Sequence, residues 1–174
     1  MIRRIPRNNP VTKTLLRPLA AALCLALLPV IAAAQGAEIA FGNVEQDPSQ
    51  PVEVTAESLS VDQDDGTAIF TGDVLIVQGE MRLAAPKVEV FYDEAGNRIQ
   101  RLKASGGVTL VSGDDAAEAA NADYSVESGT IFMQGDVLLM QGQSTLTADR
   151  MTVDTRDGTA RMEGRVRTVL QSND

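Results

Sequence analysis

The sequence predicts an all-β protein in which turns every 8 to 12 residues separate about 12 short antiparallel strands, grouped into about four related repeats. Three observations support this fold class. A six-residue motif recurs along the chain, glycines recur at a nearly constant spacing, and apolar residues alternate with polar ones. A period of two is typical of strands with one buried face. No helical pattern competes after residue 51, except in the alanine-rich stretch 114–122, which we interpret as a loop and a strand start.

The first 34 residues have the organisation of a signal peptide. Five basic residues between positions 3 and 17 precede an apolar run at 19–31, and alanines at 32–34 supply the small residues that a signal peptidase requires. We therefore expect cleavage before Gln35 and export. The alternative is an uncleaved membrane anchor, but a spanning helix needs about 20 apolar residues. The run here is shorter, and Pro29 interrupts it.

Composition disfavours catalysis, metal binding and nucleic-acid binding. The chain contains no histidine, and its single cysteine, Cys24, lies in the predicted signal peptide. The commonest general base and the commonest metal ligands are thus missing. Cleavage would leave 10 basic against 24 acidic residues, a net charge of −14. Since phosphate backbones are bound by Lys and Arg, we predict no nucleic-acid partner, no enzyme activity, no metal and no cofactor.

The predicted mature chain divides into a short linker and one domain. Residues 35–51 contain glycines and prolines with little periodicity, which predicts a flexible linker. The folded domain is expected at 52–170, and residues 171–174 form a tail.

Within this domain a motif of the form A-x-x-φ-x-V, where φ is apolar, occurs four times. Its clear copies are Ala56–Val61, Ala85–Val90 and Ala148–Val153, and a weaker copy is Asn121–Val126. Each copy is followed by a turn and a G-x-V step. The turns after the first and last copies both contain Asp-Gly-Thr, and Asp-Gly between alternating apolar residues is a strong hairpin signal.

The glycines of the G-x-V steps are Gly72, Gly106, Gly135 and Gly164, at spacings of 34, 29 and 29 residues. Such regularity is typical of stacked supersecondary units. Because glycine inside a strand marks a bend or bulge, we hypothesise that these four positions bend the sheet at one level and fold it over into a groove.

The repeat and its glycine turns resemble the OstA-like repeats of the LptA family of lipopolysaccharide export proteins, over about 52–170. The resemblance implies a folded-over antiparallel β-jellyroll, the β-taco, in the periplasm. It also implies an apolar trough for the acyl chains of lipopolysaccharide, head-to-tail self-association, and a bridge between an LptC-like inner-membrane protein and an LptD-like outer-membrane protein.

Alternation identifies the side chains that face the interior of this trough. They are aliphatic or methionine, side chains that suit hydrocarbon. Packing of an ordinary core is the alternative role for each of them. The predicted lipid-binding interior consists of Phe70, Val74, Ile76, Met81, Leu83, Val88, Val90, Leu102, Val108, Leu110, Ile131, Met133, Val137, Leu139, Met151 and Met162.

Partners are expected at the two edge strands, because a sheet that does not close leaves unpaired backbone groups. The predicted pairing residues at one end are Val52, Glu53 and Val54. At the other end they are Arg165, Val166 and Arg167. Opposite charges on the two edges favour pairing, although such charges also serve to keep edges apart.

Two other functions remain open at this point. An LptC-type scaffold would share the fold and keep the N-terminal segment as a membrane anchor. A polysaccharide-acting β-helix enzyme would need clustered carboxylates on one outward face. Equivalent outward positions here differ in sign, as Asp73 and Arg165 show, which disfavours the enzyme.

Overall fold

The computed structural model describes residues 37–42, 49–62, 66–93 and 95–170, and the predicted signal peptide and tail lie outside these residues. All regular elements within the described ranges are strands, so this part of the chain offers no helix to cross a membrane. The strands are β1 (Ala37–Ala40), β2 (Glu53–Thr55), β3 (Ser58–Asp62), β4 (Thr67–Gln78), β5 (Met81–Tyr92), β6 (Ile99–Ser112), β7 (Asp115–Ser125), β8 (Thr130–Gln141), β9 (Ser144–Asp154), β10 (Thr159–Glu163) and β11 (Arg167–Val169).

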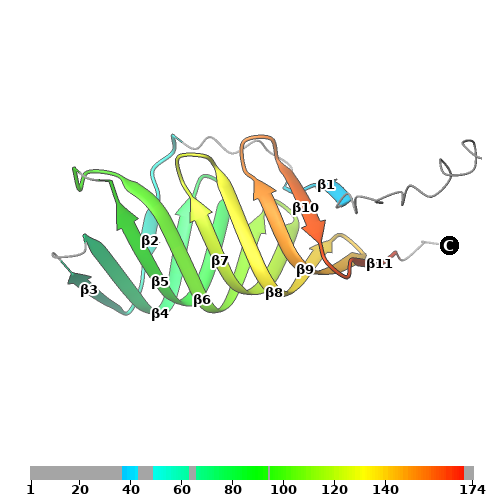
Figure 1. Ribbon diagram of the computed structural model, residues 1–174, viewed down its shortest axis with the longest axis horizontal. Coiled ribbons are helices and arrows are strands. Elements are labelled where there is room, and N and C mark those ends of the chain that lie inside the picture. Colours follow the sequence, from blue (N-terminus) through cyan, green and yellow to red (C-terminus); the bar gives the residue numbers. More distant parts are fainter. Residues whose placement is uncertain (1–36, 43–48, 63–65, 94, 171–174) are drawn as a thin grey trace, which may run out of the picture. The chain divides into compact units, whose positions relative to one another are not determined.

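The strands form one antiparallel sheet in the order β1-β10-β9-β8-β7-β6-β5-β4-β2, with β3 paired to β4 and β11 paired to β9 (Figure 1). The predicted all-β antiparallel fold is confirmed. The strands from β4 to β9 are 11 to 14 residues long, longer than expected. They are longer because the backbone pairing continues through the bends instead of stopping there.

Each bend is a β-bulge, in which two residues of one strand oppose one residue of its neighbour. In β4, Gly72 and Asp73 lie opposite the single residue Pro86, because Thr71 pairs with Lys87 and Val74 with Ala85. The same arrangement recurs at Gly106–Gly107 opposite Ala120 and at Gly135–Asp136 opposite Asp149.

Backbone conformation explains why glycine occupies these positions. The four glycines of the G-x-V steps have φ between +75° and +93°, where L side chains are strained. A Cβ atom on Gly135 would lie 2.7 Å from the Cβ of Ala120 on β7. The residues that follow them, including Asp73, Asp136 and Arg165, also have positive φ. The hypothesis that these glycines bend the sheet is confirmed.

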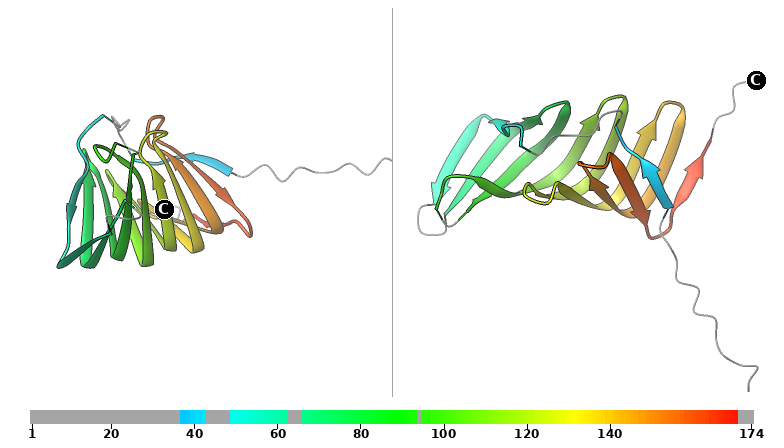
Figure 2. Two further views of the ribbon diagram at one scale, coloured as in Figure 1. Left: turned by 60° about the vertical axis from the view of Figure 1, so that its left-hand side comes forward. Right: turned by 90° about the horizontal axis from the view of Figure 1, so that it is seen from above.

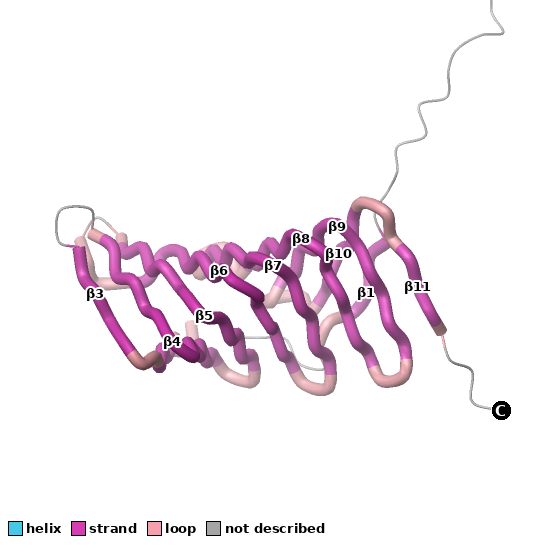
Figure 3. The backbone as a smooth tube through the Cα atoms, turned by 90° about the horizontal axis from the view of Figure 1, so that it is seen from below, coloured by secondary structure: helices cyan, strands magenta, loops and turns pink. Residues whose placement is uncertain are grey.

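The bends divide every long strand into two halves, and the halves form two facing layers (Figures 2 and 3). Layer A ends at a row of hairpin turns that we call rim A: the β4–β5, β6–β7 and β8–β9 turns. Layer B ends at rim B, formed by the β5–β6, β7–β8 and β9–β10 turns. The bends close one side of the space between the layers, and the two rims flank the opposite side, which we call the mouth.

The structure corrects the register of the third repeat. Ala120 opposes the Gly106 bend as Pro86 opposes the Gly72 bend, so the third copy of the motif is Ala119–Tyr124 rather than Asn121–Val126. The stretch 114–122, expected to be a loop and a strand start, lies almost entirely in β7, which begins at Asp115. Alanine carries a weak apolar signal, which is why the alternation is hard to follow here.

The predicted linker 35–51 contains one of the strands. β1 pairs with β10, from Ala37 opposite Met162 to Ala40 opposite Thr159. Four residues are too few for a periodicity signal, and their partner lies about 120 positions further along the chain. Residues 43–48 of the linker lie outside the described part.

Candidate functional site: the interior between the layers and its mouth

The interior between layers A and B is the candidate site, and the structure brings its predicted residues together there. Fifteen of the sixteen are at most 2% exposed, and Phe70 is partly buried against the same cluster. The inward alternation is therefore correct. Side chains from both layers pack into a single apolar core, which also takes in eight alanines outside the predicted lipid-binding set: Ala68, Ala85, Ala104, Ala117, Ala119, Ala122, Ala148 and Ala160.

A side-chain hydrogen bond joins the two layers near the mouth. The hydroxyl of Tyr124, at the rim B end of β7, donates to Oε1 of Gln78, the last residue of β4 at rim A, over 2.5 Å. Both residues are buried, at 1% and 2% exposure. Burial raises the pKa of the Tyr124 phenol, with Thr155 and the charge of Arg156 acting in the opposite direction. The phenol is thus a neutral donor at physiological pH.

A second connection between the rims comes from the residues after β1. The Phe41 backbone N–H donates to the Gly158 carbonyl at rim B, over 2.8 Å. The Gly42 N–H donates to Asp115 at rim A, also over 2.8 Å, and Gln141 binds the same carboxylate. Phe41 itself is only 3% exposed and belongs to the apolar core. This aromatic ring is thus buried in the core at the place where the chain passes from one rim to the other.

Residues 49–52 approach the mouth nearer the β2 end. The Gln50 carbonyl accepts a hydrogen bond of 3.0 Å from Nε2 of Gln78, the residue that also binds Tyr124. Beside this segment lies a cavity of about 630 Å³, which extends along rim B to Arg156. Its apolar lining includes Val52, Ile99 and Val126, all partly buried. The rest of the lining is mostly polar, so the cavity is a recess of mixed character next to the mouth.

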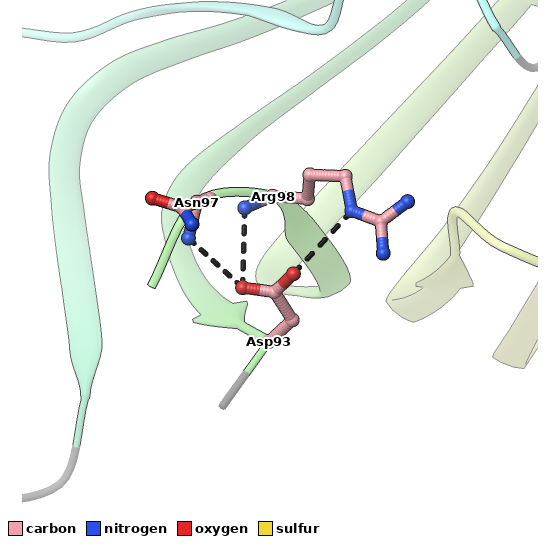
Figure 4. Close-up of polar contacts among 3 residues, drawn as sticks. All are labelled: Asp93, Asn97 and Arg98. Carbon is pink, nitrogen blue, oxygen red and sulfur yellow. Dashed lines mark hydrogen bonds and ion pairs between the residues drawn. The ribbon is translucent and has the colours of Figure 1, made fainter. Parts of the chain in front are cut away.

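The β5–β6 turn, which borders this recess, is organised by Asp93 (Figure 4). Its carboxylate accepts hydrogen bonds from the backbone N–H of Asn97, at 2.8 Å, and of Arg98, at 3.3 Å. The Arg98 guanidinium also donates to it, over 3.3 Å. The Asn97 bond is the largest effect and lowers the pKa of Asp93 below its ordinary value; desolvation opposes it, and the Arg98 contacts add to the lowering.

The outer face of the sheet is polar and carries ion pairs between neighbouring strands. Arg101 binds Asp123 with two hydrogen bonds. Lys103 lies 5.0 Å from the centre of the Phe91 ring, within cation–π range. Exposed pairs of this kind contribute about 0 to 1 kcal/mol each. The outer face is therefore a polar, exposed surface held by weak contacts, in contrast to the apolar interior.

Apolar side chains are exposed at both ends of the sheet. Leu59 and Val61 on β3 are 54% and 60% exposed, because β3 pairs only with β4 among the described strands. At the other end, Val169 is 47% and Leu170 74% exposed. Isolated exposed apolar residues are common, but here they lie on edge strands whose backbone groups can pair with another chain.

The structure places the six predicted edge residues as follows. Val52 precedes β2, which contains Glu53 and Val54. Arg167 begins β11, and Val166 precedes it at 40% exposure. Arg165 lies in the last bend, where its guanidinium binds Asp149 with hydrogen bonds from Nε, at 2.8 Å, and from Nη2. That contact lowers the pKa of Asp149.

Three residues of the mouth were not predicted as site residues: Phe41, Gln78 and Tyr124. Phe41 falls in the predicted linker, and Gln78 is a polar residue next to a turn. Tyr124 fits the apolar alternation, but its partner is 46 positions away. A tyrosine at an inward position was the one available signal, since a buried phenol requires a hydrogen-bond partner.

Comparison with known proteins agrees with this architecture. One similar solved structure is that of LptH, the LptA homologous periplasmic component of the lipopolysaccharide transport device from Pseudomonas aeruginosa. It matches this chain with a TM-score of 0.65 at 19% sequence identity. The match covers 73% of this chain and 99% of that one, and shows the fold.

Sequence comparison finds two relatives. An uncharacterised protein of Rhizobium meliloti (strain 1021) is 28% identical over 161 residues, which is 86% of this chain and 87% of that protein. The lipopolysaccharide export system protein LptH of Pseudomonas aeruginosa is 33% identical over 73 residues, 42% of this chain and 41% of its own length. The model of the family described as LptA/(LptD N-terminal domain) LPS transport protein matches residues 53–164, from β2 through the last bend glycine. The chain therefore belongs to the LptA/(LptD N-terminal domain) family of lipopolysaccharide transport proteins.

Proposed function

We propose that this protein is exported to the periplasm and carries lipopolysaccharide there without catalysis, holding its acyl chains between layers A and B. The observation that carries the proposal is the interior itself. Its sixteen predicted residues are aliphatic, methionine or phenylalanine, and they form one continuous core along the strands from β4 to β10. The relative LptH, whose structure this fold resembles, is a periplasmic transport component. Membership of the lipopolysaccharide transport family supports lipopolysaccharide as the cargo.

Acyl chains need space that this core does not leave, so binding requires the mouth to open. Among the described residues, the connections across the mouth include the Tyr124–Gln78 hydrogen bond, the Gln50–Gln78 bond, the Gln141–Ala40 bond and the bonds on either side of Phe41. A neutral hydrogen bond contributes about 1 kcal/mol net. Each methylene that leaves water contributes about 0.8 kcal/mol. Burial of a handful of methylenes therefore offsets the loss of these bonds.

Four methionines make the interior adaptable. Met81, Met133, Met151 and Met162 are all at most 2% exposed; Met81 comes from layer A and the other three from layer B. Methionine has three rotatable side-chain bonds and fills irregular spaces. We therefore propose that these side chains rearrange around acyl chains of different length, and that the recess beside Val52 and Ile99 is where a chain first enters.

Head-to-tail self-association is the second part of the proposal, and it would extend the interior from one copy to the next. It would also join an LptC-like protein at the inner membrane to an LptD-like protein at the outer membrane. The N-terminal end presents β2 with Glu53, and the C-terminal end presents β11 with Arg167. Arg165 takes the bend position that Asp73 and Asp136 occupy in earlier repeats. The positive charge at this edge favours the approach of the acidic β2 edge of another copy.

Site-specific photo-crosslinking in a lipopolysaccharide-producing cell tests the carrier proposal. A crosslinking residue at Phe70, which faces the interior and is only partly buried, is expected to capture lipopolysaccharide. The matched control is Asp73, three positions along the same strand in the outward bend. Equal labelling at both positions would show that lipid does not enter between the layers.

A further inference from the structure

The last strand of this chain repeats the first long one. Residues 159–169, which comprise β10, the Gly164 bend and β11, align without a gap on residues 67–77 of β4: Thr159 corresponds to Thr67, Gly164 to Gly72 and Val169 to Val77. The pairing on the preceding side agrees, because Asp154 opposes Thr159 as Asp62 opposes Thr67. The outer edge of β10 and β11 is therefore equivalent to the edge of β4 that receives β5.

β5 covers that edge of β4 on both sides of the bend. Its residues Met81–Ala85 pair with the layer A half, and Lys87–Phe91 pair with the layer B half. In the N-terminal part of the chain, β2 and β3 correspond to the two halves of β5, and only Ala56 and Glu57 lie between them. A second copy of this chain thus carries, in β2 and β3, the segment that fits the whole edge of β10 and β11.

The layer B half of this edge is already occupied by the chain's own β1. Ala37, Glu38 and Ile39 pair with Met162, Arg161 and Ala160. In the same register and direction, Val88, Glu89 and Val90 of β5 pair with Phe70, Ile69 and Ala68 of β4. In the repeated motif, Leu59, Ser60 and Val61 correspond to Val88, Glu89 and Val90. In a second copy, these three residues of β3 are therefore the ones expected to pair with Met162, Arg161 and Ala160.

We propose that β1 is an internal substitute for β3 of the next copy, and that it caps the C-terminal edge until a second copy displaces it. The inference rests on the head-to-tail association proposed above and assigns its regulation to residues 37–40. Figure 2 shows β1 beside β10, while β11 lies apart from it in the other layer. β11 pairs only with β9 among the described strands. The layer A half of the edge is thus the open place where an incoming β2 begins to pair.

Strand spacing explains why β1 has to leave. With β1 in place, layer B extends one strand further than layer A at this end. An incoming copy that pairs its β2 with β11 would have to place its β3 beyond β1, offset by about 4.8 Å. Its β3 would then run parallel to β1, whereas all pairs of this sheet are antiparallel. The two residues between β2 and β3 leave little freedom for such an offset.

The contacts of β1 suit a reversible cap. The strand has four residues, and its Glu38–Arg161 ion pair, at 3.0 Å, is more than half exposed on both sides. Such pairs contribute little. Ile39 packs against the core, and Phe41 follows directly. Because β1 belongs to the same chain, its high effective concentration keeps it paired until a partner arrives at sufficient concentration.

The test measures self-association of the exported protein by sedimentation, in wild type and three variants. Ile39→Asp places a charge against the core and unseats β1, so association is expected to tighten about tenfold, the factor that removal of an intramolecular competitor can give. Glu38→Gln, one position away on the outer side, is the matched control and should resemble wild type. Glu38→Cys with Arg161→Cys joins β1 to β10 when oxidised. Oxidation should weaken association, and a reductant should restore it in the same sample.

Hydrogen exchange of the assembled protein gives an independent measure. Amides of residues 37–40 should lose protection on assembly while those of β3 gain it. If β1 gains protection instead, the partner adds beyond it and the cap is refuted. If all four proteins associate equally, the cap is refuted and head-to-tail association stands. If none associates at any concentration, both proposals fall.

Discussion

Tyr124 and Gln78 lie on opposite layers of the sheet, 46 positions apart, and the phenol of one donates a hydrogen bond to the side-chain oxygen of the other. Both side chains are buried, and the other buried polar residues of the described part of the chain are Ser112 and Thr155. A buried hydrogen bond of this kind fixes the two layers relative to each other, because its geometry is lost when they separate. It therefore couples stability to the opening that the proposed lipid binding requires.

Replacement of Tyr124 by Phe should lower the free energy of unfolding by about 1 to 2 kcal/mol, because Gln78 loses a donor inside the core. The same change should speed lipid uptake, since one connection across the mouth is gone. Denaturant titration and the rate of lipopolysaccharide binding measure the two effects. Tyr92→Phe, at the partly buried end of β5, is the control and should change neither. A Tyr124→Phe variant as stable and as slow as wild type would contradict the role of this bond.

Gly135→Ala should destabilise the protein more than Gly107→Ala, although both residues lie in bends with positive φ. The new Cβ at position 135 would meet the Ala120 Cβ at 2.7 Å, whereas a Cβ at Gly107 has no atom within 4 Å. Both variants carry the backbone strain of about 1 to 2 kcal/mol, and only the first adds a clash. Thermal denaturation measures the difference. Adding Ala120→Gly to Gly135→Ala should bring its stability close to that of Gly107→Ala. If stability is not restored, the clash with Ala120 is not the cause of the loss.

Ile76→Ala and Leu75→Ala compare the two faces of β4 at adjacent positions. Ile76 is wholly buried, and truncation of such a residue costs about 2 to 5 kcal/mol. Leu75 is 37% exposed on the outer face, so its truncation should cost about 1 kcal/mol or less. Urea denaturation separates these values easily. Equal losses would mean that the inward and outward faces of layer A are wrongly assigned.

Asp93→Asn should alter the acid sensitivity of the protein. The pKa of Asp93 is lowered in the folded state, chiefly by the Asn97 N–H, so the unfolded chain binds its proton more tightly. The stabilisation from this carboxylate is therefore present above the unfolded pKa of about 3.9, and is lost as the pH falls through the folded pKa. The variant should be less stable than wild type at neutral pH, and the difference should vanish in strong acid.

Denaturation midpoints from neutral to strongly acidic pH measure this difference. Glu118→Gln, which removes an exposed carboxylate from β7, serves as the control. A constant difference between Asp93→Asn and wild type at every pH would show that the amide changes the turn rather than its titration.

The parts of the site that were predictable are those encoded by local alternation. Val74 and Ile76 are inward because residues two apart share a face of a strand, and both are buried as expected. Gly72 and Gly164 mark bends because no other residue tolerates their backbone conformation without strain. Where the residues are small, as at Ala119 and Ala122 in β7, the pattern weakened and the expected register was two residues off.

The sequence by itself determined the repeat, the level of the bends and the face of each strand that is apolar, since all three depend on residues close together in the chain. Tertiary structure decided how the mouth is closed and what covers the C-terminal edge. Phe41 lies in the core and β1 pairs with β10 because the folded sheet places residues 37–42 beside residues 158–162. Backbone pairing over such a separation depends on available edges rather than on side-chain pattern, so no local signal in the sequence specifies it.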